Sequence, residues 1–290
     1  MKRAVTLALL VPGCVGPAPA PPSRVAIARA PVQPVSSRLT IEGAAIQGAL
    51  VHGQASPGTR ALSVDGRDVA LAPDGRFVIG IDRDAGASAR IVEIGDGQSG
   101  WTGETVLAVA PRAWPIERVD APFRAGKSDA EFAAQRPGEL AVIQAARTVR
   151  SDAQGWRQRF RWPATGRLSG RFGAQRVYRG EPGSYHSGAD VAVPTGTPVT
   201  APADGVVVLA AERPYTLEGR VLIVDHGMGV NSALLHLSRI DVGVGDRVRQ
   251  GQIVGASGAT GRVSGPHLHW SVQWLGAKLD PLLVAGAPSG

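Results

Sequence analysis

GPHLHWSVQW, residues 265 to 274, places two histidines two positions apart inside an otherwise apolar run. Side chains of a β-strand alternate between its two faces. One face would therefore carry the polar residues of this run, which are His267, His269, Ser271 and Gln273. The opposite face would carry Leu268, Trp270, Val272 and Trp274. The pattern predicts a strand whose apolar face lies in a core and whose imidazole face forms a site.

The composition of the whole chain favours the same kind of structure. Of its 290 residues, 43% are hydrophobic and only 19% are charged, while 38 glycines and 22 prolines supply frequent turns. Short runs with period-two alternation recur between these turns. The sequence therefore predicts a mainly β protein with antiparallel sheets, not a helical bundle or a disordered chain.

Two neutral imidazoles on one face of a strand suit a catalytic metal site. Their β-carbons would lie ~6 to 7 Å apart, so one nitrogen can reach a metal while the other lies beside the metal's bound water. A structural zinc site usually takes four protein ligands that include thiolates. The chain has only one cysteine, Cys14, so a catalytic site with three protein ligands and an open position is the better fit.

The expected source of further ligands is HSGAD, residues 186 to 190. In a straight strand His186 and Asp190 would lie ~13 Å apart, which is too far for one metal ion. The chain must therefore bend between them, and Gly188 permits a bend. Alone this pair is a weak signal, but the His-Leu-His pattern downstream strengthens it considerably.

Residues 160 to 282 resemble the catalytic domain of lysostaphin-like (LytM-domain) zinc metallopeptidases, which cut peptide bonds in bacterial peptidoglycan. Three histidine motifs carry the resemblance in the family's order: HSGAD at 186–190, LLHLS at 234–238 and GPHLHW at 265–270. The stretches TGTPVTAPADGVVV, VLIVDHGMG and VGDRVRQGQIVGASGATGRVSG lie between them, and LDP follows.

This resemblance implies a set of site residues and a reaction. His186, Asp190 and His269 are expected to bind Zn²⁺, and His236 and His267 to act as acid/base and transition-state partners. The expected reaction is the cleavage of stem or cross-link peptides of peptidoglycan by a metal-activated water. One position departs from the family, because Leu234 stands where relatives commonly have a tyrosine.

The N-terminus resembles an export signal. Lys2 and Arg3 precede the apolar residues 4 to 11, a length typical of the hydrophobic region of a signal peptide and too short to span a bilayer. Val11 to Cys14 resembles a lipoprotein box, which would attach lipid to Cys14, whereas Ala18 to Ala20 would suit ordinary cleavage. We expect a periplasmic or cell-envelope protein, with a lipid anchor through Cys14 as one of the two outcomes.

Turn residues and changes in composition divide the chain into four expected parts. Residues 1–37 form the signal and a Pro/Ala-rich tether, and residues 38–115 a small β-sandwich that loosely resembles immunoglobulin-like modules. Residues 116–160 form a linker with helical segments, and residues 161–290 the antiparallel, barrel-like peptidase domain.

Two helices are expected in the linker. Ser128 to Glu131 forms a capping box, which predicts that a short helix begins there. A second helix is expected from Pro137 to about Ser151, with Pro137 in its first turn. The residues that would share one face of this helix are Leu140, Ile143, Ala146 and Arg147.

The net charge of +7 suits any polyanion, and all but three of the 31 basic residues are arginine. No basic run alternates with aromatic residues, so we do not expect nucleic acid as a partner. Peptidoglycan is the partner that the family resemblance implies. Two alternatives remain from the sequence. One is a catalytically restrained protein of the same fold that activates a wall amidase, and the other is a module that only binds the wall. The sequence does not predict the oligomeric state.

Overall fold

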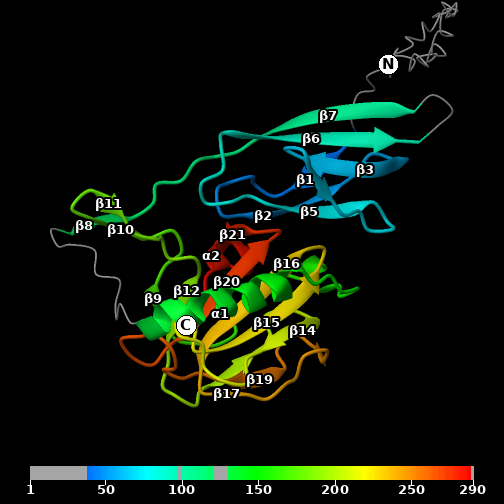
Figure 1. Cartoon of the computed structure of the whole chain (residues 1–290). Coiled ribbons are helices and arrows are strands. Elements are labelled where there is room, and N and C mark those ends of the chain that lie inside the picture. The colour runs from blue at the N-terminus through cyan, green and yellow to red at the C-terminus, as the bar shows by residue number, and fades with distance from the viewer. Residues whose placement is uncertain (1–37, 97–99, 120–129, 289–290) are drawn as a thin grey trace, which may run out of the picture. The chain divides into compact units, whose positions relative to one another are not determined.

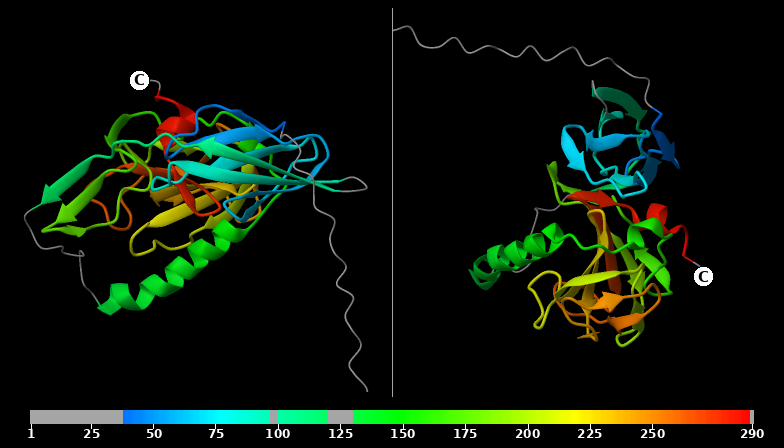
Figure 2. Two further views of the ribbon diagram at one scale, coloured as in Figure 1. Left: turned by 90° about the horizontal axis from the view of Figure 1, so that it is seen from above. Right: turned by 90° about the vertical axis from the view of Figure 1, so that its right-hand side faces the viewer.

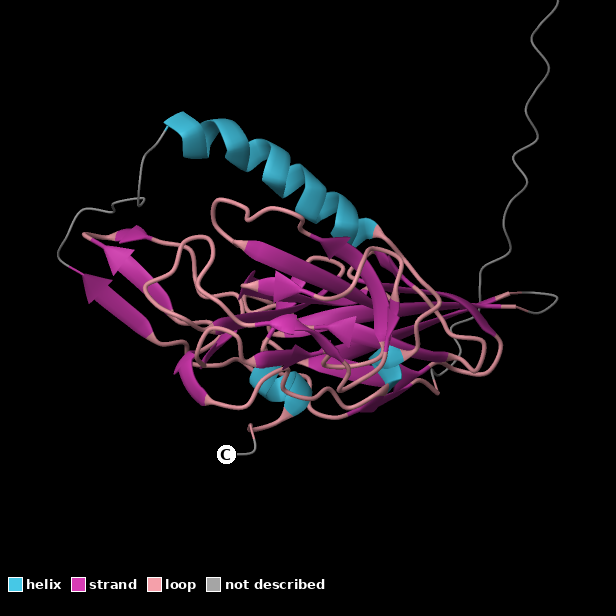
Figure 3. Ribbon diagram, turned by 90° about the horizontal axis from the view of Figure 1, so that it is seen from below, coloured by secondary structure: helices cyan, strands magenta, loops and turns pink. Residues whose placement is uncertain are grey.

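The computed structural model describes residues 38–96, 100–119 and 130–288. Strands dominate these residues, and Figure 3 shows α1 (Ala130–Thr148) as the long helix among them. The predicted mainly β fold with antiparallel sheets is confirmed. The predicted signal, Cys14 and Ser128 lie outside the described residues. None of the helices among the described residues combines the length and apolar character that a membrane span would need.

Seven strands between residues 40 and 108 form two antiparallel sheets. The first sheet has the order β1 (Thr40–Glu42), β2 (Leu50–Gln54), β5 (Arg76–Gly80). The second has the order β4 (Arg67–Val69), β3 (Thr59–Val64), β6 (Ser88–Gly95), β7 (Trp101–Ala108). Val51, Phe77, Leu62 and Ile91 are buried in one cluster, as alternation predicts. The immunoglobulin-like assignment stays a prediction.

The largest sheet carries the histidine motifs (Figure 1). Its strand order is β18 (Arg247–Val248), β14 (Gly205–Ala210), β15 (Arg220–Gly227), β16 (Val230–Leu237), β20 (Leu268–Trp274), β12 (Ala189–Ala192), β9 (Arg167–Gly170), and β21 (Ala277–Leu279) pairs with β20. Every pairing in it is antiparallel. We call it the central sheet.

Smaller elements complete the described chain. One three-stranded sheet has the order β13 (Pro198–Thr200), β19 (Ile253–Ala256), β17 (Arg239–Ile240). Another has the order β11 (Glu181–Pro182), β10 (Gln175–Tyr178), β8 (Ile116–Val119), in which β8 and β10 are parallel. A 3₁₀ turn covers Gly155–Arg157, and the short helix α2 covers Pro281–Ala285.

Both faces of the central sheet are covered. Leu222, Leu234 and Trp270 are fully buried on the face toward the main core. Ile223 and Ala233 are buried on the other face, where α1 supplies Ile143 and Ala146 (Figures 1 and 2). The predicted apolar face of residues 268 to 274 therefore lies in the core. The imidazole face is also largely buried, because Ser271 on that face is only 3% exposed.

Helix α1 is one continuous helix, whereas the sequence predicts two with Pro137 near the start of the second. Pro137 lies inside α1, although it cannot donate a helical hydrogen bond. Side chains on both sides of it are fixed by the hairpin between β14 and β15. The guanidinium of Arg136 pairs with Glu218 at 2.5 and 2.8 Å, and Glu139 accepts from the amide and hydroxyl of Thr216 at 2.8 and 2.5 Å. These contacts explain why tertiary structure prevails over the local preference.

His226 is a structural histidine of the central sheet. Its ring is fully buried, with Nδ1 donating to the Asp204 carbonyl at 2.8 Å and Nε2 accepting from the Ser232 hydroxyl at 2.9 Å. The indole of Trp270 donates to the same hydroxyl at 3.2 Å. Burial lowers the pKa of His226 from 6.5 to about 4. The ring is therefore neutral in the folded protein at neutral pH.

This burial predicts that acid destabilises the fold through His226. Since its folded-state pKa is lowered, the contribution is fully present above pH 6.5 and is lost as the pH falls through about 4. We expect a loss on the order of 3 kcal/mol between pH 7 and pH 4 from this residue. Urea unfolding of the wild type and of His226→Gln at both pH values measures it. The variant should be less stable at pH 7 and lose less on acidification, so parallel losses would contradict the prediction.

Candidate metal centre

The pairing of β12 with β20 brings Asp190 directly opposite His269. Paired residues of an antiparallel ladder project to the same face, so both side chains project from the α1 side of the central sheet. His186 precedes β12, and its ring also reaches this point. The ligand atoms of His186, Asp190 and His269 all lie within 4.8 Å of one another. The structure thus brings together the three residues that the sequence proposes as metal ligands.

The contacts among these three residues are short. His186 Nε2 lies 3.1 Å from Asp190 Oδ1 and 3.1 Å from His269 Nδ1, and His269 Nδ1 lies 2.8 Å from Asp190 Oδ1. Two imidazole nitrogens and one carboxylate oxygen thus face a common point. Such a set of N and O donors, with no thiolate, matches the ligands of catalytic zinc sites.

Main-chain contacts fix the orientation of His186. Its Nδ1 lies 3.0 Å from the carbonyl of Arg171. A carbonyl only accepts, so Nδ1 carries a proton, and Nε2 is the nitrogen that turns toward Asp190 and His269. A cation bound there would take the lone pair of Nε2 in place of a proton. A backbone carbonyl on the far nitrogen is the usual support of a metal-binding histidine.

The electrostatics of the cluster keep its carboxylate charged. Burial raises the pKa of Asp190, but hydrogen bonds from His186 and His269 outweigh burial and hold it well below its usual range. Burial lowers the pKa of His186, yet the hydrogen bond and charge of Asp190 leave it above its ordinary value. Burial lowers the pKa of His269. An ionised Asp190 beside a neutral His269 is the state that a cation requires.

Gly188 is needed for space. It is not among the glycines with positive φ, so a left-handed backbone is not the reason for a glycine here. A β-carbon at this position would lie 2.4 Å from the carbonyl oxygen of Trp270 and 2.7 Å from His269 Nε2. The glycine lets the chain before β12 lie directly against the ring of His269.

His236 and His267 lie beside the three candidate ligands. Their ring centroids are 4.8 Å apart, and His267 Nε2 is 3.8 Å from Asp190 Oδ1. In each ring Nδ1 donates to a main-chain carbonyl, that of Thr260 for His236 and of Gly265 for His267, both at 2.9 Å. The Nε2 atom of each neutral ring is therefore left as the basic nitrogen. Burial lowers the pKa of His236 to about 4, so that ring is neutral at pH 7.

A backbone irregularity places His236 at this site. Strict alternation would put His236 on the same face as Leu234, which is fully buried in the main core. The register of β16 against β15 shifts between Arg220 and Leu222, and His236 has a φ of +64°. A bulge of this kind redirects a side chain, and a positive φ outside glycine is uncommon. Leu234, at the position of the family's tyrosine, precedes the bulge and packs in the core opposite Leu222.

Two residues that the sequence analysis did not single out support His236. The amide of His236 donates to the carbonyl of Glu218 at 2.9 Å, and the carboxylate of Glu218 pairs with Arg136 of α1. The side chains of Arg136 and Glu218 are only 16% and 13% exposed. The sequence does not indicate that Arg136 and Glu218 pair, because they lie 82 residues apart and both residue types are common on protein surfaces.

The site retains access to solvent. Side-chain exposure is 26% for His186, 21% for Asp190, 17% for His267 and 10% for His269. The three donors therefore fit a cation that keeps one position open, as the sequence analysis expects for a catalytic zinc and not for a closed structural one.

Comparison with known proteins defines the class of this domain. Three converging donors flanked by two imidazoles are typical of a metallopeptidase, and residues 184–281 match the model of Peptidase family M23. Residues 184–281 thus match the M23 peptidase domain, in agreement with the lysostaphin-like (LytM) resemblance of the sequence.

Curated relatives share this part of the chain. It is 41% identical to the peptidoglycan DD-endopeptidase ShyA of Vibrio cholerae over 129 residues, which cover 43% of this chain and 29% of that protein. It is 39% identical to the DD-carboxypeptidase/endopeptidase Mpg of Neisseria meningitidis over 100 residues, covering 34% of this chain and 23% of that protein. The chain thus spans less than a third of the length of these relatives.

A solved structure matches more of the chain. A crystal structure from Pseudomonas aeruginosa, described as a candidate M23 peptidase, aligns with a TM-score of 0.65 at 29% identity. The alignment covers 84% of this chain and 96% of that one. This likeness confirms the mainly β architecture over most of the described residues.

Proposed function

We propose that this protein is a zinc-dependent endopeptidase that cleaves stem or cross-link peptides of bacterial peptidoglycan. The observation that carries the proposal is the convergence of His186, Asp190, His236, His267 and His269 from three separate stretches of chain onto one solvent-accessible point. ShyA is a peptidoglycan DD-endopeptidase by name, and the matched M23 domain supports extending that substrate class to this chain.

We assign metal binding to His186, Asp190 and His269. A zinc ion held there supplies Lewis-acid polarisation of the scissile carbonyl and a water with a pKa lowered toward ~7. The three donors are pre-arranged, because β-sheet pairing fixes Asp190 against His269 and the Arg171 carbonyl fixes the ring of His186. Little reorganisation is then needed when the ion binds.

We assign proton transfer to His236 and His267. His267 turns Nε2 toward the cluster, 3.8 Å from Asp190 Oδ1, and in both rings Nδ1 is held by a main-chain carbonyl. A neutral imidazole in this orientation accepts a proton at Nε2 and returns it to the leaving amine. The lowered pKa of His236 keeps that ring neutral at pH 7 and so able to accept a proton. Asp190 is the carboxylate whose charge acts on His236, and it is assigned to the metal, so we assign to histidine the part that glutamate plays in other zinc peptidases.

The substrate class implies a location outside the cytoplasm. We propose that the apolar residues 4 to 11 direct export and that the protein acts in the periplasm or cell envelope. Attachment of lipid to Cys14 remains a prediction. Mass spectrometry of the mature N-terminus distinguishes a lipidated Cys14 from a chain cleaved near Ala20.

The exposure of the site favours an active peptidase over a restrained, amidase-activating protein. Helix α1, in the expected linker, packs against β14 and β15, and a quarter of the His186 side chain remains exposed. The described part of the linker thus leaves the cluster accessible. A module that only binds the wall would gain nothing from His236 and His267 beside three metal donors.

Digestion of purified sacculi tests the proposal. The full chain is stripped of metal with a chelator, and one half is reloaded with one equivalent of Zn²⁺. We expect the reloaded protein to convert cross-linked muropeptides into smaller peptides and the stripped protein to leave them intact. Unchanged muropeptides in the presence of stoichiometric zinc would contradict peptidase activity and favour the restrained alternative.

A further inference from the structure

Arg83 is a buried arginine in the loop between β5 and β6 of the N-terminal sheets. Its side chain is only 8% exposed, although it carries a permanent charge. Burying such a charge is costly unless it is paired and hydrogen-bonded. The partners that offset this cost therefore indicate what Arg83 stabilises.

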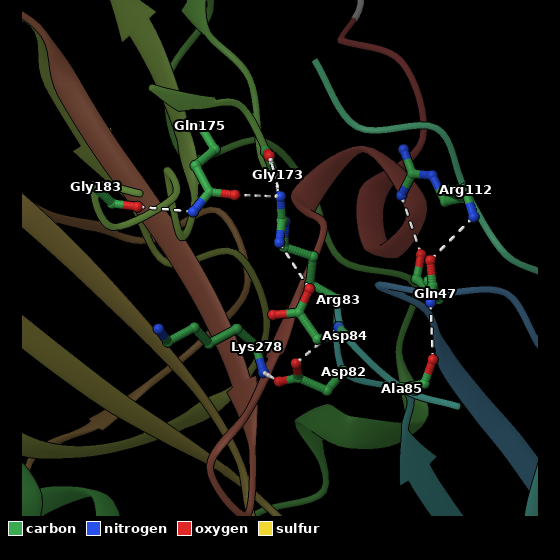
Figure 4. A network of polar contacts seen from close by, with 10 residues as sticks. All are labelled: Gln47, Asp82, Arg83, Asp84, Ala85, Arg112, Gly173, Gln175, Gly183 and Lys278. Atoms are coloured by element: carbon green, nitrogen blue, oxygen red, sulfur yellow. Dashed lines mark hydrogen bonds and ion pairs between the residues drawn. The ribbon is translucent and has the colours of Figure 1, made fainter. Parts of the chain in front are cut away.

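The guanidinium of Arg83 bonds to the segment between β9 and β12 (Figure 4). Its Nε and Nη2 lie 3.3 and 3.1 Å from the carbonyl of Gly173, and Nη2 lies 3.2 Å from Gln175 Oε1. Nη1 pairs with Asp84 at 2.6 Å. Gln175 in turn donates to the carbonyl of Gly183 at 2.7 Å. One side chain thus binds two positions of the segment 171–186.

Aromatic rings enclose the same guanidinium. Arg83 lies 4.3 Å from the ring centroid of Tyr185 and 5.3 Å from that of Trp114. Phe172 packs edge-on against both rings at 5.6 and 5.9 Å. Cation–π contacts of desolvated arginines are stronger than exposed ones. The residue immediately before His186 therefore packs on Arg83.

The segment held by Arg83 is the one that fixes His186. Gly173 donates to the carbonyl of His186 at 2.9 Å, and His186 donates through its amide to Ala174 at 2.8 Å. The ring Nδ1 of His186 donates to Arg171 at 3.0 Å. All three contacts lie within residues 171–174, where Arg83 binds Gly173. A shift of this segment would move the ring of His186 away from Asp190 and His269.

We infer that Arg83 is a positioning residue for the metal centre, so that the N-terminal sheets complete the site and are more than a targeting module. The inference rests on the proposed role of His186 as a ligand. Partners that bond a metal-binding histidine directly orient it, and their loss typically lowers metal affinity ~10- to 100-fold. Arg83 holds the segment that supplies these partners to His186.

Zinc affinity of the full chain tests this inference. Competition with a chromogenic chelator gives the Kd of the wild type, Arg83→Met and Arg83→Lys. We expect Arg83→Met to raise the Kd by ~10- to 100-fold. Arg83→Lys keeps the charge between the rings but lacks the fork that binds two acceptors, so a smaller rise of about fivefold is expected. The absorption spectrum of the Co²⁺-loaded protein should change in both variants, because ligand geometry changes.

Arg67→Ala is the matched control. Arg67 also belongs to the N-terminal sheets, and its guanidinium donates to the carbonyl of Leu275 at 2.5 Å. Leu275 lies within the matched residues 184–281 but outside the segment 171–186. Its zinc Kd should stay within about twofold of the wild type. An equal rise in Arg67→Ala and Arg83→Met would overturn the inference, since loosened docking would explain both.

The remaining outcomes are also decisive. An unchanged Kd and Co²⁺ spectrum in a folded Arg83→Met, shown by an unaltered circular dichroism spectrum, overturns the inference. If Arg83→Met does not fold, Arg83→Lys decides in the same way. Zinc binding is measured without substrate, so failure to cleave sacculi leaves this test intact. A wild type that binds no zinc would instead remove the proposed function itself, and the inference with it.

Discussion

Replacing His269 by alanine should abolish zinc binding and peptidase activity together, whereas replacing His267 should abolish turnover and leave most of the zinc bound. His269 Nδ1 lies 2.8 Å from Asp190 Oδ1 and 3.1 Å from His186 Nε2, in the centre of the donor set. His267 Nε2 lies farther out, 3.8 Å from the same carboxylate oxygen. The two rings thus occupy different positions although only Leu268 separates them in the sequence, since His267 lies just before β20 and His269 within it.

The two variants should lose different properties, zinc affinity in one and turnover rate in the other. Loss of a ligand should weaken zinc binding by more than the ~10- to 100-fold typical of outer partners. Loss of a proton-transfer group typically costs ~10²- to 10⁴-fold in rate. Metal content after dialysis, measured beside turnover on a cross-linked muropeptide, separates the two effects. Equal zinc loss in both variants would overturn this division of roles.

Gly188→Ala should disrupt the site with the addition of a single methyl group. The new β-carbon would lie 2.4 Å from the Trp270 carbonyl oxygen and 2.7 Å from His269 Nε2. The closer of these atoms belongs to the backbone, which cannot move aside as the end of a flexible side chain can. Either the chain before β12 or the ring of His269 must move. We expect a fall in zinc affinity of at least tenfold and a loss of stability of roughly 1 to 3 kcal/mol.

Gly86→Ala provides the control for this change. Nothing lies within 4 Å of a β-carbon at Gly86, and its φ is not positive. Zinc affinity and the urea midpoint of this variant should match the wild type. If Gly188→Ala also matches the wild type in zinc affinity, the close packing of this glycine does not shape the metal centre.

The sequence predicted the structure best where every second residue of a strand is apolar and faces the core. Leu268, Trp270 and Val272 are fully buried, as the alternation of residues 268 to 274 predicts. The bend between His186 and Asp190 also follows from distance alone. What alternation cannot reveal is which strand pairs with which, and the β12 to β20 register is what places Asp190 opposite His269.

Other features of the site could not be predicted from the sequence. A bulge reverses the side on which His236 projects, and one extra residue in a strand has no compositional mark. In α1 the apolar stripe predicts Ile143 and Ala146 correctly, but Leu140 is 38% exposed. Glu139 is buried in its place, because its carboxylate binds Thr216. Hydrophobic periodicity cannot predict a buried acid whose partner lies 77 residues away.

The carbonyls of Arg171, Thr260 and Gly265 hold the Nδ1 atoms of three imidazoles. A peptide carbonyl is the same chemical group whichever amino acid bears it. The tautomers of these rings are therefore independent of the side chains at those loop positions. Thr260 is also fixed by its hydroxyl, which accepts from the Arg220 amide and donates to the Leu237 carbonyl, so the exposed position 171 is the one to randomise. Substitutions there should change the surface beside the site while leaving the Nδ1 proton of His186 in place.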